Sequence, residues 1–199
     1  MVTVRIFIEG GGSGKISDKV FKEAWTKFFT AAGLTGRMPK IVRGEGRSTT
    51  FRKFRTAHRR PSELLLLLVD SEGPVADGHS AWQHLRARLE DNWEQPLEAG
   101  DNSAYLMVQV METWFLADRD ALRRFFGPSL NENSFGHWPN LEEVHKDTVL
   151  DALERATSNC QKPYRKGKVS FELLGRVDPQ LVAAACPHAN QLLTYLRTP

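Results

Sequence analysis

The sequence lacks the features that several classes of protein require. No apolar stretch exceeds the length of Leu64 to Val69, which is far below the roughly 20 residues of a membrane-spanning helix. Only two cysteines occur, Cys160 and Cys186, and neither has metal-ligand spacing around it, so both are expected to be reduced thiols. The chain begins without a basic lead or a cleavable apolar segment. These absences predict a cytoplasmic protein with no membrane partner.

Histidine and net charge are also scarce. The six histidines include no pair at ligand spacing, which argues against a zinc site. The formal charge of +3 is too small to establish a polyanionic partner. The stretch from Arg43 to Arg60 is strongly basic, with Glu45 as its only acid, but such a run is more often a solvated helix face than a nucleic-acid contact. Neither feature assigns a function by itself.

The pattern of apolar residues predicts a single α/β domain over residues 1–199. The 41% hydrophobic and 26% charged residues of this chain are typical of one globular core. Strands are predicted at 2–8, 40–43, 64–69 and 105–110. A helix is predicted after each of the first two strands, with Asp18 and Ser48 as the expected N-terminal caps. The part from about 128 to 199 is predicted to be helical. This alternation predicts a mostly parallel central sheet flanked by helices. The core is expected to contain Phe21, Trp25, Phe28, Phe51, Phe54 and the run 64–69.

Acidic residues follow each predicted strand. They are Glu9 after the first, Glu45 after the second, Asp70 and Glu72 after the third, and Glu112 after the fourth. Parallel strands end at one edge of their sheet, where ligands bind in α/β proteins. Burial explains the strands but not the carboxylates at their ends. We therefore expect a site for Mg²⁺ or Mn²⁺ with Glu9, Asp70 and Glu72 as ligands.

Plainer alternatives exist for these acids. Asp70 would cap a turn and Glu72 would be solvated, although residues two apart point to the same side of an extended chain. Glu112 lies among large apolar residues, so it is either a ligand of a second metal or the partner of an arginine such as Arg119. The convergence of several acids favours the metal.

The glycine loop after the first strand invites a second interpretation. Gly14 and Lys15 before a helix are similar to the end of a phosphate-binding loop, which would predict a phosphotransferase. However, Glu9 stands in place of the first glycine, and Ile16 replaces the hydroxyl residue that binds the metal. If the substrate is instead a nucleic-acid backbone, the expected phosphate contacts are Lys15, Arg43, Arg47, Lys166 and Lys168.

The first-strand glutamate with its glycine loop, followed by an Asp-x-acid pair, resembles the Toprim domain of topoisomerases, primases and OLD-type nucleases. The likeness is closer to an uncharacterised bacterial Toprim-like family, a domain of unknown function, and it extends over nearly the whole chain. The segments that carry it are 7–12 (FIEGGG), 68–72 (LVDSE), 109–118 (QVMETWFLAD) and 166–174 (KGKVSFELL).

The resemblance implies a role for each acid. Glu9 would be a general acid or base, and Asp70 with Glu72 would bind Mg²⁺, although Glu72 replaces the aspartate of the usual motif. The implied activity is metal-dependent cleavage of nucleic acid, with DNA ranked ahead of RNA, by an effector of bacterial defence that works with an ATPase partner. The alternative is a non-catalytic subunit that docks an ATPase or nucleic acid.

Overall fold

Four parallel strands form the centre of the protein. The computed structural model describes residues 3–10, 17–58 and 63–198. The strand order is β2-β1-β3-β4, and every pairing is parallel, so all four strands end at the same edge of the sheet. The strands are β1 (Val4–Ile8), β2 (Lys40–Arg43), β3 (Leu64–Asp70) and β4 (Ala104–Met107). The predicted fold class is thus confirmed.

Alternate residues of each strand face opposite layers of helices. Ile6 and Leu66 belong to the larger buried cluster, which includes side chains of α1 (Asp18–Ala31) and α8 (Pro187–Arg197). Their neighbours Phe7, Leu65 and Leu67 belong to a second cluster. That cluster includes α2 (Arg47–Ala57) and α3 (Ala81–Ala87). Because β3 is covered on both faces, its sequence is an unbroken apolar run rather than an alternation.

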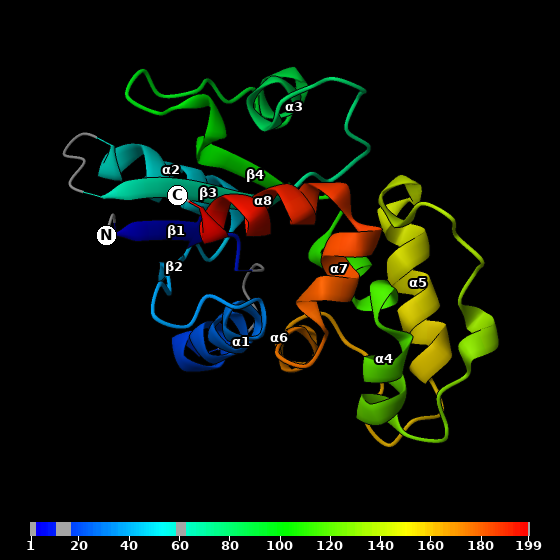
Figure 1. Cartoon of the computed structure of the whole chain (residues 1–199). Coiled ribbons are helices and arrows are strands. Elements are labelled where there is room, and N and C mark those ends of the chain that lie inside the picture. Colours follow the sequence, from blue (N-terminus) through cyan, green and yellow to red (C-terminus); the bar gives the residue numbers. More distant parts are fainter. Residues whose placement is uncertain (1–2, 11–16, 59–62, 199) are drawn as a thin grey trace.

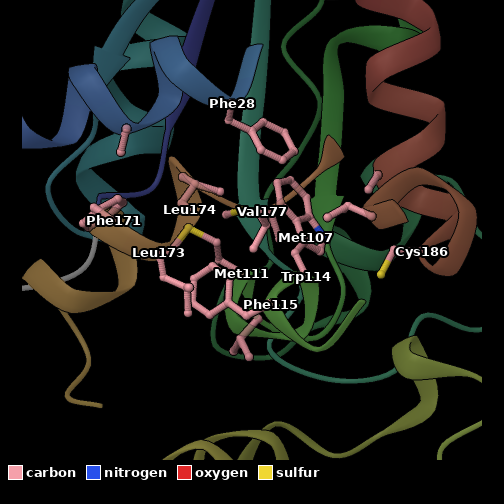
Figure 2. Packing of buried hydrophobic residues seen from close by; sticks show 14 of the residues in the cluster. Phe28, Met107, Met111, Trp114, Phe115, Phe171, Leu173, Leu174, Val177 and Cys186 are labelled. Atoms are coloured by element: carbon pink, nitrogen blue, oxygen red, sulfur yellow. The ribbon is translucent and has the colours of Figure 1, made fainter. Parts of the chain in front are cut away.

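An aromatic group on α1 forms the centre of the larger cluster. Trp25 is completely buried, and its ring lies 5.9 Å from that of Trp114. Figure 2 shows Phe28 directed toward Trp114, and the two ring centroids lie 5.4 Å apart in a stacked arrangement. The predicted core residues are confirmed as buried, except that Leu64 is only partly so. Phe51 and Phe54 pack on the opposite face of the sheet from Trp25.

The predicted caps of the first two helices are wrong. Ser17 caps α1, because its hydroxyl accepts from the Val20 amide, whereas the Asp18 carboxylate pairs with Arg43 at 3.1 Å. The second helix already begins at Arg47, after Gly46 in extended conformation, so Ser48 lies inside it. Both errors shift a helix start by one or two residues without changing which face is buried.

After β4 the chain becomes helical, as predicted. The fourth strand is shorter than expected because the backbone turns after Met107 into the 3₁₀ helix η2 (Met111–Ala117). The predicted break near Asp118 is confirmed, since its carboxylate caps the next helix by accepting from the Ala121 amide at 2.8 Å. The remaining elements are η1 (Asp101–Ser103), α4 (Arg119–Phe126), η3 (Glu132–Ser134), η4 (Leu141–Glu143), α5 (Lys146–Thr157), α6 (Lys168–Leu174) and α7 (Pro179–Ala185).

The helices that follow β4 gather beside the sheet. Figure 1 shows α4, α5 and α7 at one side, while α8 runs back along β4. The helix α6 packs against α1, and the rings of Phe171 and Phe21 lie 5.1 Å apart at this contact. Among the described residues, no helix is long and apolar enough to cross a membrane.

Candidate metal centre

Three of the predicted acids meet at the edge where the strands end. Glu9 follows β1, Asp70 is the last residue of β3, and Glu72 lies two residues further on. One carboxylate oxygen from each lies within 4.8 Å of the others. We call these three residues the acidic cluster. Their convergence follows from the parallel pairing of β1 with β3, which places both strand ends side by side.

Glu72 reaches the acidic cluster by a different route from the one expected. Its φ angle is 62°, in the left-handed region that a glutamate rarely adopts, so the chain is not extended at this point. The conformation is held by its amide, which donates to the Gln109 carbonyl at 2.8 Å. The extended-chain argument for Asp70 and Glu72 was therefore wrong in its geometry. A left-handed non-glycine residue at such a place is typical of functional sites.

Asp70 is the most deeply enclosed member of the acidic cluster. Its side chain accepts from the Met111 amide at 2.8 Å through Oδ1, and the residue is only 7% exposed. Burial raises the pKa of Asp70 well above its usual range, and the nearby charges of Glu9, Glu112 and Glu72 raise it further, with Lys166 opposing them. Burial and like charges of this kind disfavour the charged form of an aspartate, and a nearby cation favours it.

Glu9 is joined to Asp70 through the backbone. Its Oε2 accepts from the Asp70 amide at 3.3 Å and from Nη1 of Arg47 at 3.2 Å. Burial raises the pKa of Glu9, and Glu72 adds to this, whereas Arg47 and the hydrogen bonds lower it. The net direction is upward, so burial outweighs the arginine.

Arg47 connects the acidic cluster to Asp91 by hydrogen bonds within the protein. Its guanidinium donates to both carboxylate oxygens of Asp91, at 2.7 and 2.6 Å, and to the Asp70 carbonyl. It also lies 5.0 Å from the ring centre of Trp93. Its side chain is 15% exposed and that of Asp91 only 3%. The sequence reasoning missed Asp91, whose one signal is its position three residues after Arg88, to which it also bonds at 2.8 Å.

A lysine from a distant helix contacts the third acid. Nζ of Lys146, the first residue of α5, donates to Oε2 of Glu72 at 2.5 Å. Burial would raise the pKa of Glu72, but the hydrogen bond and charge of Lys146 prevail and lower it. Nothing in the sequence around Lys146 signals this contact, because the two residues lie 74 positions apart.

Glu112 lies next to the acidic cluster but outside it. Its Oε1 accepts from the Tyr164 hydroxyl at 2.8 Å and from the Ser170 hydroxyl at 3.2 Å. Its Oε2 is buried, accepts no hydrogen bond within the described ranges, and lies 4.0 Å from Nζ of Lys166.

Arg119, the arginine suggested as a partner of Glu112, makes its contacts elsewhere. Arg119 donates to the Gly136 carbonyl at 3.4 Å and lies over the ring of Phe135.

The other basic residues singled out in the sequence differ in their surroundings. Arg43 pairs with Asp18, and its side chain packs so closely beneath Gly10 that a Cβ there would lie 2.7 Å from it. Lys168 is exposed and pairs with Glu172 along its own helix at 3.8 Å. Lys166 is half-exposed, and although burial opposes its charge, the four nearby carboxylates raise its pKa. Lys15, with the phosphate-loop interpretation that depends on it, lies outside the described residues.

Glu45 does not join the acidic cluster. Its side chain is exposed and pairs with Lys53 at 3.5 Å, although it follows a strand that ends at the same edge. The acidic cluster is therefore selective, because it unites the acids of the two central strands β1 and β3 and leaves out that of the edge strand β2.

The acidic cluster fits a hard divalent cation. Mg²⁺ binds oxygen at about 2.0–2.1 Å and Ca²⁺ at about 2.3–2.6 Å, so two ligands of one ion are up to about 5 Å apart. The 4.8 Å limit among Glu9, Asp70 and Glu72 is within this span. All donors are carboxylate oxygens, which Mg²⁺ and Mn²⁺ accept and which zinc sites seldom use alone. Burial and the neighbouring acids disfavour the charged form of Asp70, which such an ion would favour.

The comparisons place the chain in a family without assigning a reaction. Residues 8–197 match a domain of unknown function (DUF4276), and because the match covers nearly the whole chain, this protein belongs to that family. No curated protein and no solved structure matches the chain.

Proposed function

We propose that this member of the DUF4276 family is a metal-dependent phosphodiesterase that cleaves nucleic acid, with a Toprim-like arrangement of acids. The observation that carries the proposal is the acidic cluster itself, in which Glu9, Asp70 and Glu72 offer oxygens within 4.8 Å at the edge where parallel strands end. Three carboxylates at this position do not stabilise the fold, because each negative charge raises the free energy of the ionised form of the others. A divalent cation removes that repulsion.

Each acid has a distinct part in the proposed reaction. Asp70 and Glu72 would hold Mg²⁺ or Mn²⁺, which supplies a charge that polarises the scissile phosphate and lowers the pKa of water. Glu9 would exchange a proton with the attacking or leaving oxygen, and its raised pKa brings it closer to the pH at which a general acid or base works best. Arg47 holds Glu9 in place through the second pair that it makes with Asp91.

Glu112 is proposed as a ligand of a second cation. Its Oε1 is engaged by Tyr164 and Ser170, which leaves Oε2 as the oxygen for a metal. Two-metal sites separate their ions by about 3.5–4 Å and stabilise both the attacking and the leaving oxygen. In this arrangement Lys166, at 4.0 Å from Glu112, would occupy the position of that cation in the metal-free protein.

We propose DNA, in preference to RNA, as the substrate. The proposed setting is the bacterial cytoplasm, where the protein would work with an ATPase partner in defence. Support for a polymeric phosphate comes from two lysines at the start of α6. The side chains of Lys166, just before this helix, and Lys168, its first residue, are half-exposed or more. Sequence-independent phosphate contacts of this kind govern the affinity of nucleic-acid enzymes.

Metal binding and cleavage can be tested in matched variants. The wild type is expected to bind Mn²⁺ by titration calorimetry and to nick supercoiled plasmid in Mn²⁺ but not in EDTA. Glu9→Gln and Asp70→Asn should abolish nicking, with Asp70→Asn also losing Mn²⁺ affinity. Glu45→Gln is the control, because this exposed acid follows the neighbouring strand but lies outside the acidic cluster. Equal nicking by the wild type and Asp70→Asn would refute the proposal.

A second candidate is a non-catalytic subunit that docks an ATPase or nucleic acid. The observation in its favour is that two members of the acidic cluster already have an internal cation, Arg47 for Glu9 and Lys146 for Glu72. If the plasmid remains intact while the purified protein still retains DNA in a shift assay, this candidate replaces the first.

A further inference from the structure

Lys146 occupies a position that is unfavourable for a lysine. It is the first residue of α5, where the aligned peptide dipoles disfavour a positive charge. Its amide donates to Oε1 of Gln109 at 3.3 Å, which fixes the point from which the side chain extends. From there Nζ reaches Oε2 of Glu72 at 2.5 Å. The ammonium group is therefore held at this helix end by Glu72 and not by its own helix.

Glu72 is also held in an unusual state. Its backbone is left-handed, and a carboxylate oxygen of Glu72 lies within 4.8 Å of one from Glu9 and one from Asp70. One of its two oxygens is already the acceptor of the lysine. A divalent cation that took Glu72 as a ligand would bring a second positive charge next to the ammonium group, and like charges at such a distance repel strongly.

The other cations near the acidic cluster do not pair with Glu72 as Lys146 does. Arg47 is fixed by two hydrogen bonds to Asp91 and by its contact with Trp93. Lys166 makes its ion pair with Glu112 rather than with Glu72. Lys146 is different because its flexible side chain, 30% exposed, pairs directly with Glu72, a member of the acidic cluster.

We infer that Lys146 is an internal counterion that the metal displaces: it pairs with Glu72 while the site is metal-free, and on metal binding it turns to a phosphate group of the substrate. This inference rests on the proposed function and adds the order in which the metal and the substrate bind. The cation binds first, and the released ammonium group then completes the site for phosphate. Binding of substrate before the metal is disfavoured because Lys146 is still engaged.

Mn²⁺ titration of charge-matched variants tests the exchange. Lys146→Met should bind Mn²⁺ about tenfold more tightly than the wild type, a change of ~1.4 kcal/mol, because Glu72 no longer has to release a partner. Lys166→Met removes the same charge beside Glu112 without touching Glu72, so any gain should concern the proposed second ion, and the affinity for the first ion should rise clearly less than in Lys146→Met. Lys168→Met removes an exposed lysine that pairs with Glu172, and its Mn²⁺ affinity should equal that of the wild type.

A second measurement follows the released lysine. Binding of a short thymidine oligonucleotide should be tighter in Ca²⁺ than in EDTA for the wild type, and Lys146→Met should lose most of this gain. Thermal melting establishes that each variant is folded, and Lys146→Gln provides a polar replacement if the methionine variant is not.

The outcomes separate this inference from the function on which it rests. If the wild type binds Mn²⁺ and Lys146→Met binds it equally or more weakly, Lys146 merely orients Glu72, and the exchange is wrong while the metal site stands. If neither protein binds Mn²⁺, the proposed function and the exchange are both wrong. If both Lys146 variants are unfolded, the lysine is a structural ion pair, and the exchange is likewise refuted.

Discussion

Replacing Asp70 by asparagine should make the metal-free protein more stable. Asparagine keeps an oxygen that can accept from the Met111 amide, as Oδ1 of Asp70 does at 2.8 Å, but it removes the negative charge. Burial raises the pKa of Asp70, and Glu9, Glu112 and Glu72 raise it further. The folded protein therefore binds this proton more tightly than the unfolded chain does, and stability decreases as pH rises from the ordinary aspartate range through the folded pKa. Above that pH the wild type bears the full penalty, and the variant does not.

The expected size of the effect follows from the burial of the charge. Relief of an incompletely compensated buried polar group is worth on the order of 1–3 kcal/mol, and more when it is charged. In a chain of this length each kcal/mol shifts Tm by about 2–4 °C. Mn²⁺ at about 100 times its Kd stabilises the folded state by ~2.7 kcal/mol, or roughly 5–11 °C, and the variant should lose this increase.

Differential scanning calorimetry in EDTA and in Mn²⁺, at about pH 4, near the ordinary pKa of aspartate, and at pH 8, measures both effects. The advantage of Asp70→Asn in EDTA should be larger at the higher pH, and Glu45→Gln should melt with the wild type in every buffer. The reasoning is refuted if Asp70→Asn melts below the wild type in EDTA at pH 8, or if Mn²⁺ stabilises the two proteins equally.

Three further changes have defined outcomes. Trp25→Ala should lower the free energy of unfolding by about 3–5 kcal/mol in urea titration, because it empties a fully buried site against Trp114, and a loss below 1 kcal/mol would show that the cavity collapses. Arg47→Gln should cost about 3–5 kcal/mol by leaving Asp91 buried without its main partner, whereas Arg52→Gln on the exposed side of the same helix should be neutral in the same titration. Glu112→Gln should keep its bond from Tyr164 and melt near the wild type, but bind fewer Mn²⁺ ions in calorimetry; an unchanged stoichiometry would rule out a second metal at Oε2.

The parts of the fold that follow from local periodicity could be predicted from the sequence. The run from Leu64 to Val69 has no polar alternation, and this required a strand covered on both faces, which the two clusters of buried side chains provide. Parallel pairing then placed Glu9 and Asp70 at one edge without any knowledge of side-chain positions. Such inferences succeed because burial and strand direction act on whole segments.

The partners of the acids could not be predicted in the same way. Lys146 reaches Glu72 across 74 positions, and Asp91 reaches Arg47 across 44, so neither contact leaves a local pattern. The left-handed turn at Glu72 depends on a hydrogen bond to Gln109 in another strand-end segment. Contacts of this kind are fixed only when segments far apart in the sequence pack together, and no spacing along the chain reports them.

The two ends of β3 show how differently the chain treats its acids. At the start of the strand, Glu63 accepts from Lys40 and pairs with Arg5, and the hydrogen bond of Lys40 lowers its pKa. At the end of the same strand, Asp70 has no comparable ion pair within the described ranges, and burial raises its pKa. Glu63 therefore has two basic partners, whereas the more deeply buried Asp70 is surrounded mainly by other acids. A general shortage of basic residues does not explain this difference. Under the proposed function, this under-compensated carboxylate receives its cation from solution.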